Sequence, residues 1–130
     1  MSQIQINDPM EIKTVNLNEK FAAFNEHWSP KIAGELNGQM VKLAKLQGEF
    51  VMHKHDAEDE LFFVVEGKLF MELEDQTLEI NPGEFVIIPK GMMHKPYAPE
   101  EVKVMLFEPA TTLNTGTEVN ERTVSDLERI

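Results

Sequence analysis

The sequence predicts an all-β domain, because short strand-like runs alternate with turn residues along most of its length. Its 7 prolines and 7 glycines recur at short intervals. Between them lie brief runs of branched and aromatic residues, the composition that favours strands. Turns separated by roughly 8–12 residues are typical of a sandwich or a barrel. A chain of 130 residues has the length of one domain.

Charge and composition exclude several classes of function. The formal net charge of −11 argues against binding to nucleic acid or to an anionic membrane surface, since both need clustered lysine and arginine. The chain has no cysteine, which excludes disulfides and thiolate metal sites. No apolar run approaches the ~20 residues that span a bilayer, and residues 1–10 lack the basic start and apolar core of a signal peptide. We therefore expect a cytoplasmic protein without nucleic-acid or membrane partners.

One short helix is expected near the N-terminus. Asn16 or Asn18 can cap it, and apolar residues recur at helical spacing through residues 17–24. The helix should end before Pro30, because proline restricts the residue that precedes it. Residues 1–35 are expected to form an arm that packs on the barrel or is exchanged with a second copy in a homodimer.

Two hairpins are expected after this arm. Asn37-Gly38 lies between two apolar runs and is a strong hairpin signal. Gly67 separates another pair of runs and predicts a second hairpin. The paired strands are 32–36 with 40–46, and 61–66 with 68–74. Three further strands are expected at 78–80, 85–88 and 102–107, followed by a polar tail over 109–130.

Three of the four histidines and one glutamate stand at positions that suit metal binding. His53 and His55 are one residue apart, so on a strand both side chains would point to the same face. Glu60 begins an apolar run, and His94 follows a turn that contains proline and glycine. Each residue alone also fits an ordinary strand end or loop. Together, three imidazoles and one carboxylate would make a mixed nitrogen and oxygen site for a divalent metal.

The segments that carry these residues resemble the two motifs of the cupin superfamily. Residues 48–67 read GEFVMHKHDAEDELFFVVEG and follow the first motif from the first histidine onward. Residues 83–98 read GEFVIIPKGMMHKPYA and follow the second motif as far as its histidine. The sequence departs from the family pattern at Gly48, one residue closer to the first histidine than usual, and at Ala98, where asparagine is common.

The resemblance implies both a fold and a ligand set. The fold is a double-stranded β-helix, or jelly roll, over residues 36–108. The implied ligands of one divalent transition metal are His53, His55, Glu60 and His94. Because soft sulfur ligands are absent, Mn, Fe, Ni, Co, Cu and Zn all fit this donor set.

A largely apolar pocket is expected beside the metal. The alternation that turns the ligands inward also turns Val51, Phe62 and Met92 inward, so these three side chains are expected to line it. Lys42 and Lys45 have opposite parity on their strand, so one of them could face the pocket.

The leading expectation for function is a metal-dependent enzyme that acts on a small molecule. A metal with open coordination positions can bind a bidentate substrate or dioxygen, or activate a water molecule. An oxygenase, an isomerase and a lyase all stay open at this point. The alternatives are a non-catalytic module that binds or senses a small molecule, and an enzyme similar to the sugar-phosphate isomerases of the superfamily. Small cupins commonly dimerise, so the resemblance also favours a homodimer.

Overall fold

The computed structural model describes residues 12–130, so the first 11 residues of the expected N-terminal arm lie outside the described part. Within this part the chain forms one short helix and seven strands. The helix is α1 (Leu17–Ala22). The strands are β1 (Lys31–Leu36), β2 (Gln39–Glu49), β3 (Glu60–Glu66), β4 (Leu69–Glu72), β5 (Thr77–Ile80), β6 (Phe85–Ile88) and β7 (Lys95–Pro109).

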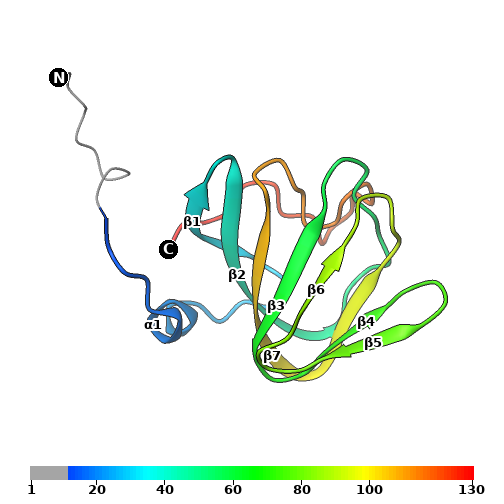
Figure 1. The fold of residues 1–130 in the computed structure, drawn as a ribbon, viewed down its shortest axis with the longest axis horizontal. Helices are drawn as coiled ribbons and strands as arrows, with labels where there is room; N and C mark the ends of the chain where they lie inside the picture. The colour runs from blue at the N-terminus through cyan, green and yellow to red at the C-terminus, as the bar shows by residue number, and fades with distance from the viewer. Residues whose placement is uncertain (1–11) are drawn as a thin grey trace.

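All strand pairs are antiparallel, and the long strand β7 connects the two parts of the sheet. The strand order is β1-β2-β7-β3-β6, and β4 pairs with both β5 and β7. The second half of β7 pairs with β2 and β3, while its first half pairs with β4 and with the end of β2. Figure 1 shows the β4–β5 hairpin diverging from the other strands on the far side of β7. This all-β jelly roll confirms the predicted fold class.

The first predicted hairpin is confirmed, and its turn explains why. Asn37 and Gly38 both have positive φ, at 51° and 80°. Two successive residues with positive φ form the type I′ turn, whose twist matches that of the flanking strands. The register of β1 and β2 accordingly runs without a gap from Leu36↔Gln39 at the turn to Gly34↔Val41.

The second predicted hairpin is wrong. β3 pairs with β6 and β7, whereas β4 pairs with β5 and β7, so the strands on either side of Gly67 do not pair with each other. Gly67 has a φ of +91°, and a Cβ atom there would lie 2.8 Å from the Glu101 carbonyl oxygen and 3.1 Å from the Val102 Cα. The glycine therefore lets the chain cross closely over β7 and continue, where the sequence suggested a reversal.

The strand β7 is longer than the sequence predicted. Residues 102–107 were expected, but the strand begins at Lys95. The first half of the strand was not predicted because it contains Pro96 and Pro99, and proline cannot donate a hydrogen bond to a neighbouring strand. The carbonyl of Pro96 is nevertheless used, because it accepts a hydrogen bond from the Phe50 N–H at 3.1 Å.

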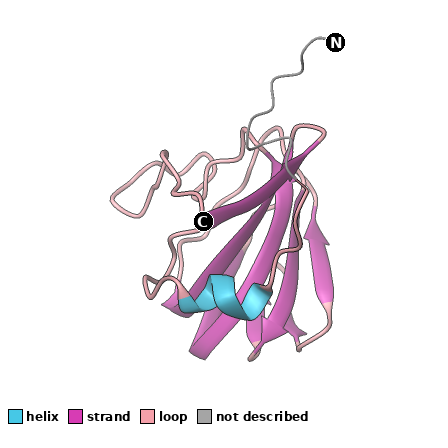
Figure 2. Cartoon of the chain, turned by 90° about the vertical axis from the view of Figure 1, so that its left-hand side faces the viewer, coloured by secondary structure: helices cyan, strands magenta, loops and turns pink. Residues whose placement is uncertain are grey.

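The sheet buries side chains on both of its faces. The inner face holds the main core, which includes the buried residues Phe62, Leu69, Met71, Val102 and Val104. The outer face is covered in part by α1, whose predicted cap is confirmed, since the Asn16 side chain accepts a hydrogen bond from the Glu19 N–H at 2.9 Å. Figure 2 shows α1 lying across the strands on this side.

The arm is anchored on the outer face by two aromatic rings. Phe21 and Phe24 are buried there against Leu43 of β2. The part of the arm that the structure describes thus packs on its own sheet. Across residues 12–130, no helix has the length and apolar character needed to cross a membrane.

Candidate metal centre

The structure brings the four predicted ligands together in the interior of the barrel. His53 and His55 lie between β2 and β3, Glu60 is the first residue of β3, and His94 immediately precedes β7. All four are almost fully buried, with exposed fractions of 3%, 3%, 4% and 0%. The expected placement of the histidine pair on a strand is wrong, because that segment is a loop with a single bridge at His53. The two side chains are nevertheless both turned inward.

Backbone hydrogen bonds hold the two histidine segments against each other. The His53 N–H donates to the His94 carbonyl at 2.9 Å, and the His94 N–H donates to the His53 carbonyl at 2.8 Å. The Gly91 N–H donates to the His55 carbonyl at 2.7 Å. The two sequence motifs therefore meet through their main chains, which places three imidazoles side by side.

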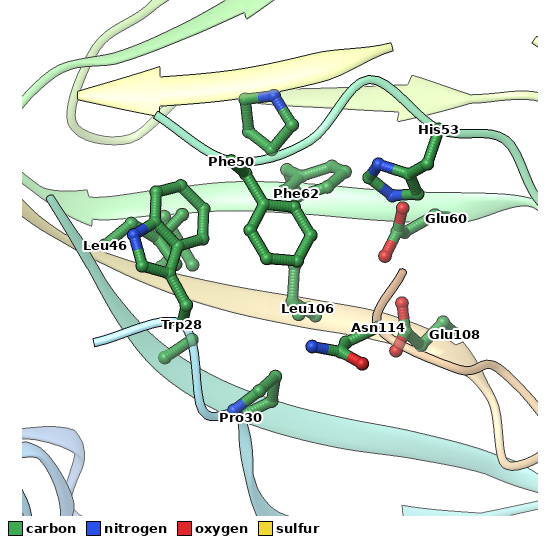
Figure 3. Close-up of a pocket in the computed structure, with 13 residues that line it drawn as sticks. Trp28, Pro30, Leu46, Phe50, His53, Glu60, Phe62, Leu106, Glu108 and Asn114 are labelled. Atoms are coloured by element: carbon green, nitrogen blue, oxygen red, sulfur yellow. The ribbon is translucent and has the colours of Figure 1, made fainter. Parts of the chain in front are cut away.

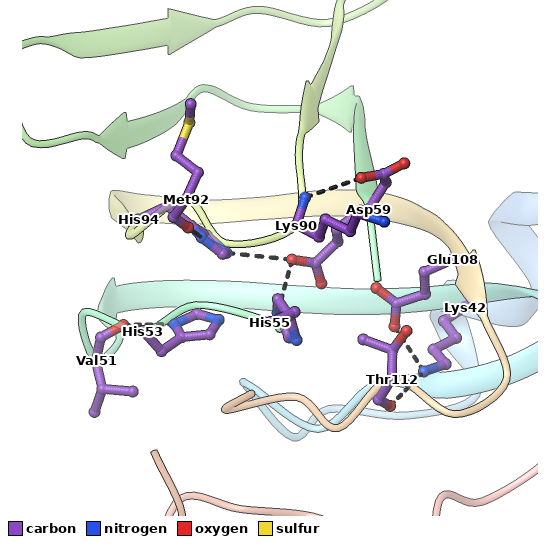
Figure 4. Close-up of polar contacts among 11 residues, drawn as sticks. Lys42, Val51, His53, His55, Asp59, Lys90, Met92, His94, Glu108 and Thr112 are labelled. Carbon is purple, nitrogen blue, oxygen red and sulfur yellow. Dashed lines mark hydrogen bonds and ion pairs between the residues drawn. The ribbon is translucent and has the colours of Figure 1, made fainter. Parts of the chain in front are cut away.

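Two of the imidazoles are oriented by backbone carbonyls. His53 Nδ1 donates to the carbonyl of Val51 at 2.8 Å, and His94 Nδ1 donates to the carbonyl of Met92 at 3.0 Å (Figure 4). A proton on Nδ1 leaves Nε2 of a neutral imidazole with a free lone pair, the arrangement typical of histidines that bind metals. Both Nε2 atoms are therefore prepared as ligands.

The donor atoms converge on a space of the right size. Glu60 Oε1 lies 3.2 Å from His55 Nε2 and 3.2 Å from His94 Nε2. One ligand atom from each of the four residues can be chosen so that all lie within 4.8 Å of one another. Atoms bound at about 2.1 Å to one ion are separated by roughly 3–4 Å, so small adjustments would suffice. Among residues 12–130, His55 Nδ1 is buried without a hydrogen-bond partner and His55 Nε2 has only the contact with Glu60, so the ring is available to a metal.

The electrostatics of the cluster also suit a cation. Burial would raise the pKa of Glu60, but the adjacent imidazoles of His55 and His94 lower it well below its usual range, with a further contribution from the Glu108 carboxyl. Burial lowers the pKa of His53 from 6.5 to about 4, assisted by the neighbouring His94. An ionised carboxylate and a neutral imidazole are the protonation states that coordinate a metal.

A cavity of about 40 Å³ adjoins this cluster, and its walls are mainly apolar (Figure 3). The rings of Trp28 and Phe50 stack at 4.7 Å on one side of it. Of the three residues predicted to line a pocket, Phe62 is among the lining residues, whereas Val51 and Met92 are not. The lining residues are Trp28, Pro30, Ala44, Leu46, Phe50, His53, Glu60, Phe62, Pro96, Val104, Leu106, Glu108 and Asn114.

Sequence reasoning missed the second polar group of this cavity. Glu108 is 2% exposed, and its Oε2 accepts from Lys42 Nζ at 2.6 Å. Alternation contained the signal, because Glu108 shares the parity of the buried Val104 and Leu106 on β7. Of the two lysines considered, Lys42 is thus the one turned inward.

The polar segment after β7 also reaches the site. Asn114 lines the cavity, and the Thr117 N–H donates to the Lys54 carbonyl at 3.0 Å. A Cβ atom at Gly116 would lie 1.9 Å from that same carbonyl oxygen. The expected tail therefore packs against the histidine loop, and only glycine permits the close approach.

Comparison with known proteins identifies the class of protein. Residues 39–108 match the Cupin domain family, and the chain belongs to this family. The resemblance of the two motifs to this family is therefore confirmed.

Solved structures show the same fold. A cupin-2 domain containing protein from Shewanella frigidimarina is 48% identical with a TM-score of 0.72, over 73% of this chain and 93% of that chain. Protein NMB1881 from Neisseria meningitidis is 31% identical with a TM-score of 0.69, over 75% of this chain and 100% of that one. Protein YdbB of Bacillus subtilis is 39% identical over 62 residues, 47% of this chain. The matched segment spans about half of YdbB, 55% of its length.

Proposed function

We propose that the chain binds one divalent transition metal through His53, His55, Glu60 and His94, and that it is a metal-dependent enzyme acting on a small molecule. The observation that carries the proposal is the convergence of four buried donor groups, one ligand atom from each within 4.8 Å of the others, beside a cavity with apolar walls. Oxygenation, isomerisation and a lyase step are the reaction classes that suit such a centre.

A bound metal and the walls of the cavity would have different roles. Three neutral imidazoles and one carboxylate would leave a divalent cation with net charge +1. When bound, such a cation supplies Lewis acidity and open positions for substrate, dioxygen or water. The stacked rings of Trp28 and Phe50 exclude water from the cavity wall, which strengthens polar interactions inside.

The character of the cavity favours a small ligand without a phosphate group. About 40 Å³ accommodates roughly three water-sized groups. Within residues 12–130, no lysine or arginine lines the cavity, and two glutamates do. Phosphate recognition requires cationic or backbone N–H donors, so this lining does not support the sugar-phosphate alternative.

The first experiment measures metal in protein purified without added metal, followed by titration with divalent ions. We expect about one equivalent at saturation. Less than about 0.1 equivalent, with no uptake on titration, would refute the metal centre.

The second experiment separates an enzyme from a binding module. Oxygen uptake and product formation are measured over a panel of small molecules, with His53→Ala as the matched inactive variant. An enzyme gives turnover that this variant loses. Saturable ligand binding without any product would favour the non-catalytic alternative instead.

We also propose that the chain forms a homodimer through the outer face of β6. Phe85 and Ile87 are 60% and 54% exposed there. Their cross-strand neighbours Phe63 and Leu61 continue the apolar surface onto β3. An apolar surface of this kind on a sheet is typical of an interface between subunits.

A further inference from the structure

A second carboxylate faces the cavity from the wall beside the metal centre. Glu108 lies near the end of β7, where it pairs with Met40 of β2, and it belongs to none of the four ligand positions. Its side chain is 2% exposed and lines the cavity. Figure 3 shows its carboxylate turned toward that of Glu60. The cavity therefore has two acidic groups, of which one belongs to the metal cluster.

Lys42 holds the Glu108 carboxylate in place without lining the cavity itself. Lys42 Nζ donates to Glu108 Oε2 at 2.6 Å and to the Thr112 carbonyl at 3.4 Å (Figure 4). Lys42 is itself 2% exposed and is absent from the cavity lining. The ammonium group thus compensates the charge of Glu108 and fixes its orientation, but a ligand in the cavity would meet the carboxylate first.

The other oxygen of Glu108 has no hydrogen-bond donor. Glu108 Oε1 is fully buried and has no donor partner among residues 12–130. Lys42 occupies the other oxygen of the same carboxylate. A buried carboxylate oxygen of this kind lacks a donor unless a molecule in the cavity supplies one, and an unsatisfied charged acceptor is strongly unfavourable.

We propose that Glu108 Oε1 is the second recognition point of the small molecule that binds at the metal, and that it accepts a hydrogen bond from an O–H or N–H group of that molecule. The inference rests on the proposed function. It specifies the ligand class as a small molecule with an apolar body and a donor group close to its metal-binding atoms. A group with acceptors only, such as a phosphate or a carboxylate, would meet Glu108 unfavourably. Lys42 is a positioning residue in this arrangement.

The test uses the Co²⁺-loaded protein and a matched pair of small chelators. Acetohydroxamic acid carries an N–H donor beside its metal-binding oxygens, and N-methylacetohydroxamic acid lacks it. Their dissociation constants are measured by the visible absorption of the bound Co²⁺. For the parent protein we expect acetohydroxamic acid to bind about tenfold or more tightly than its methylated relative, because a hydrogen bond to a charged group is lost.

Two variants test whether the tighter binding of acetohydroxamic acid depends on Glu108. In Glu108→Gln the preference should fall several-fold, because a neutral amide oxygen is a weaker acceptor. In the double variant Lys42→Met with Glu108→Leu the preference should disappear. The double variant replaces a buried ion pair by apolar side chains of similar size, a change that folded proteins often tolerate, so it carries the test where the single variant does not fold.

The matched control is Lys45→Met, which removes a buried ammonium from the same strand but on its other face. It should leave both dissociation constants unchanged. Equal affinities of the two chelators for the parent protein would overturn the proposal. So would a preference that persists in the double variant, since it would then come from the size of the methyl group. A parent protein that takes up no Co²⁺ would instead refute the proposed function on which the inference rests.

Discussion

The two faces of β2 each bury a lysine, and the two lysines have different surroundings. Lys42 points into the barrel and is 2% exposed, while Lys45 points to the outer face and is 7% exposed. Lys42 forms an ion pair with Glu108 at 2.6 Å. Lys45 Nζ donates to the Phe24 carbonyl at 2.7 Å and lies 5.1 Å from the centre of the Phe24 ring.

The difference separates the face that carries the proposed metal centre from the face that carries the arm. On the inner face, two carboxylates, an ammonium and three imidazoles are buried near one another, so each depends on its neighbours for compensation. On the outer face, the buried ammonium fastens the arm to the sheet with one backbone hydrogen bond and an aromatic contact. The inner groups therefore form a coupled network, whereas the outer contact can be removed by itself.

The largest change in the free energy of unfolding is expected when one of these lysines is replaced at a time. Lys42→Met should lower the free energy of unfolding by about 3–5 kcal/mol, because it leaves Glu108 buried without its cation. Lys45→Met should lower it by about 1–2 kcal/mol, the loss of one charged hydrogen bond. Urea unfolding of both variants checks this order. Equal losses would show that Glu108 is not held by Lys42 in solution.

The histidines allow a matching comparison for metal affinity. His94→Ala should weaken binding of a divalent metal by about 100-fold or more, since even residues that only orient ligands contribute 10- to 100-fold. The barrel should still fold, because apolar contacts form the main core.

His27 is the control for this variant, because it lies outside the cluster and contacts Glu101 at 2.8 Å. His27→Ala should bind metal as the parent does in a chelator competition. A fold that collapses in His94→Ala would mean that the metal site is chiefly structural.

The inner face should also make the metal-free protein sensitive to acid. The pKa of His53 is lowered by burial to about 4, whereas its ordinary value is 6.5. Between these values the unfolded chain binds more protons than the folded one, so stability is complete above about pH 6.5 and falls toward pH 4. The contribution of His53 to this loss should be about 2–3 kcal/mol.

Unfolding of the metal-free protein by urea at several pH values measures this loss. The His53→Gln variant should lose less stability over the same range. Identical pH profiles for the parent and His53→Gln would contradict the assignment to this residue.

The smallest change in the free energy of unfolding is expected from a substitution on the exposed side of β6. Phe85→Lys should change the free energy of unfolding by no more than about 0.5 kcal/mol. It should nevertheless dissociate the proposed homodimer, measured by analytical ultracentrifugation. Val119→Lys is the control, since Val119 is also exposed, at 72%, but lies outside the strands. A parent protein that sediments as a monomer would refute the homodimer.

Much of the site could be predicted from local sequence, and particular residues show why. The hairpin at Asn37-Gly38 and the cap at Asn16 depend on neighbouring residues alone, so the sequence predicted both. The four ligands were implied by two motifs, each a continuous segment of chain. The pairing of β4 was mispredicted because it depends on β7, a strand that comes later in the chain.

The polar residues around the cavity also could not be predicted from local sequence. Glu108 and Lys42 are separated by 66 residues, and neither belongs to a motif. Parity left open whether Lys42 or Lys45 points inward, and it did not indicate that Lys42 would meet Glu108. Asn114 reaches the cavity from a segment that by composition resembled an ordinary tail.

The sequence by itself determined the all-β class, the short helix and the first hairpin, since these follow from periodicity and turn chemistry, and the resemblance of its two motifs to the cupin superfamily implied the four candidate ligands. Only the tertiary structure decided which strands pair across the barrel, that the histidine loops are joined by their main chains, and that Lys42 pairs with Glu108 on the wall of the cavity. Such contacts join residues far apart in the chain, and their formation depends on how the whole sheet closes, which no local pattern encodes.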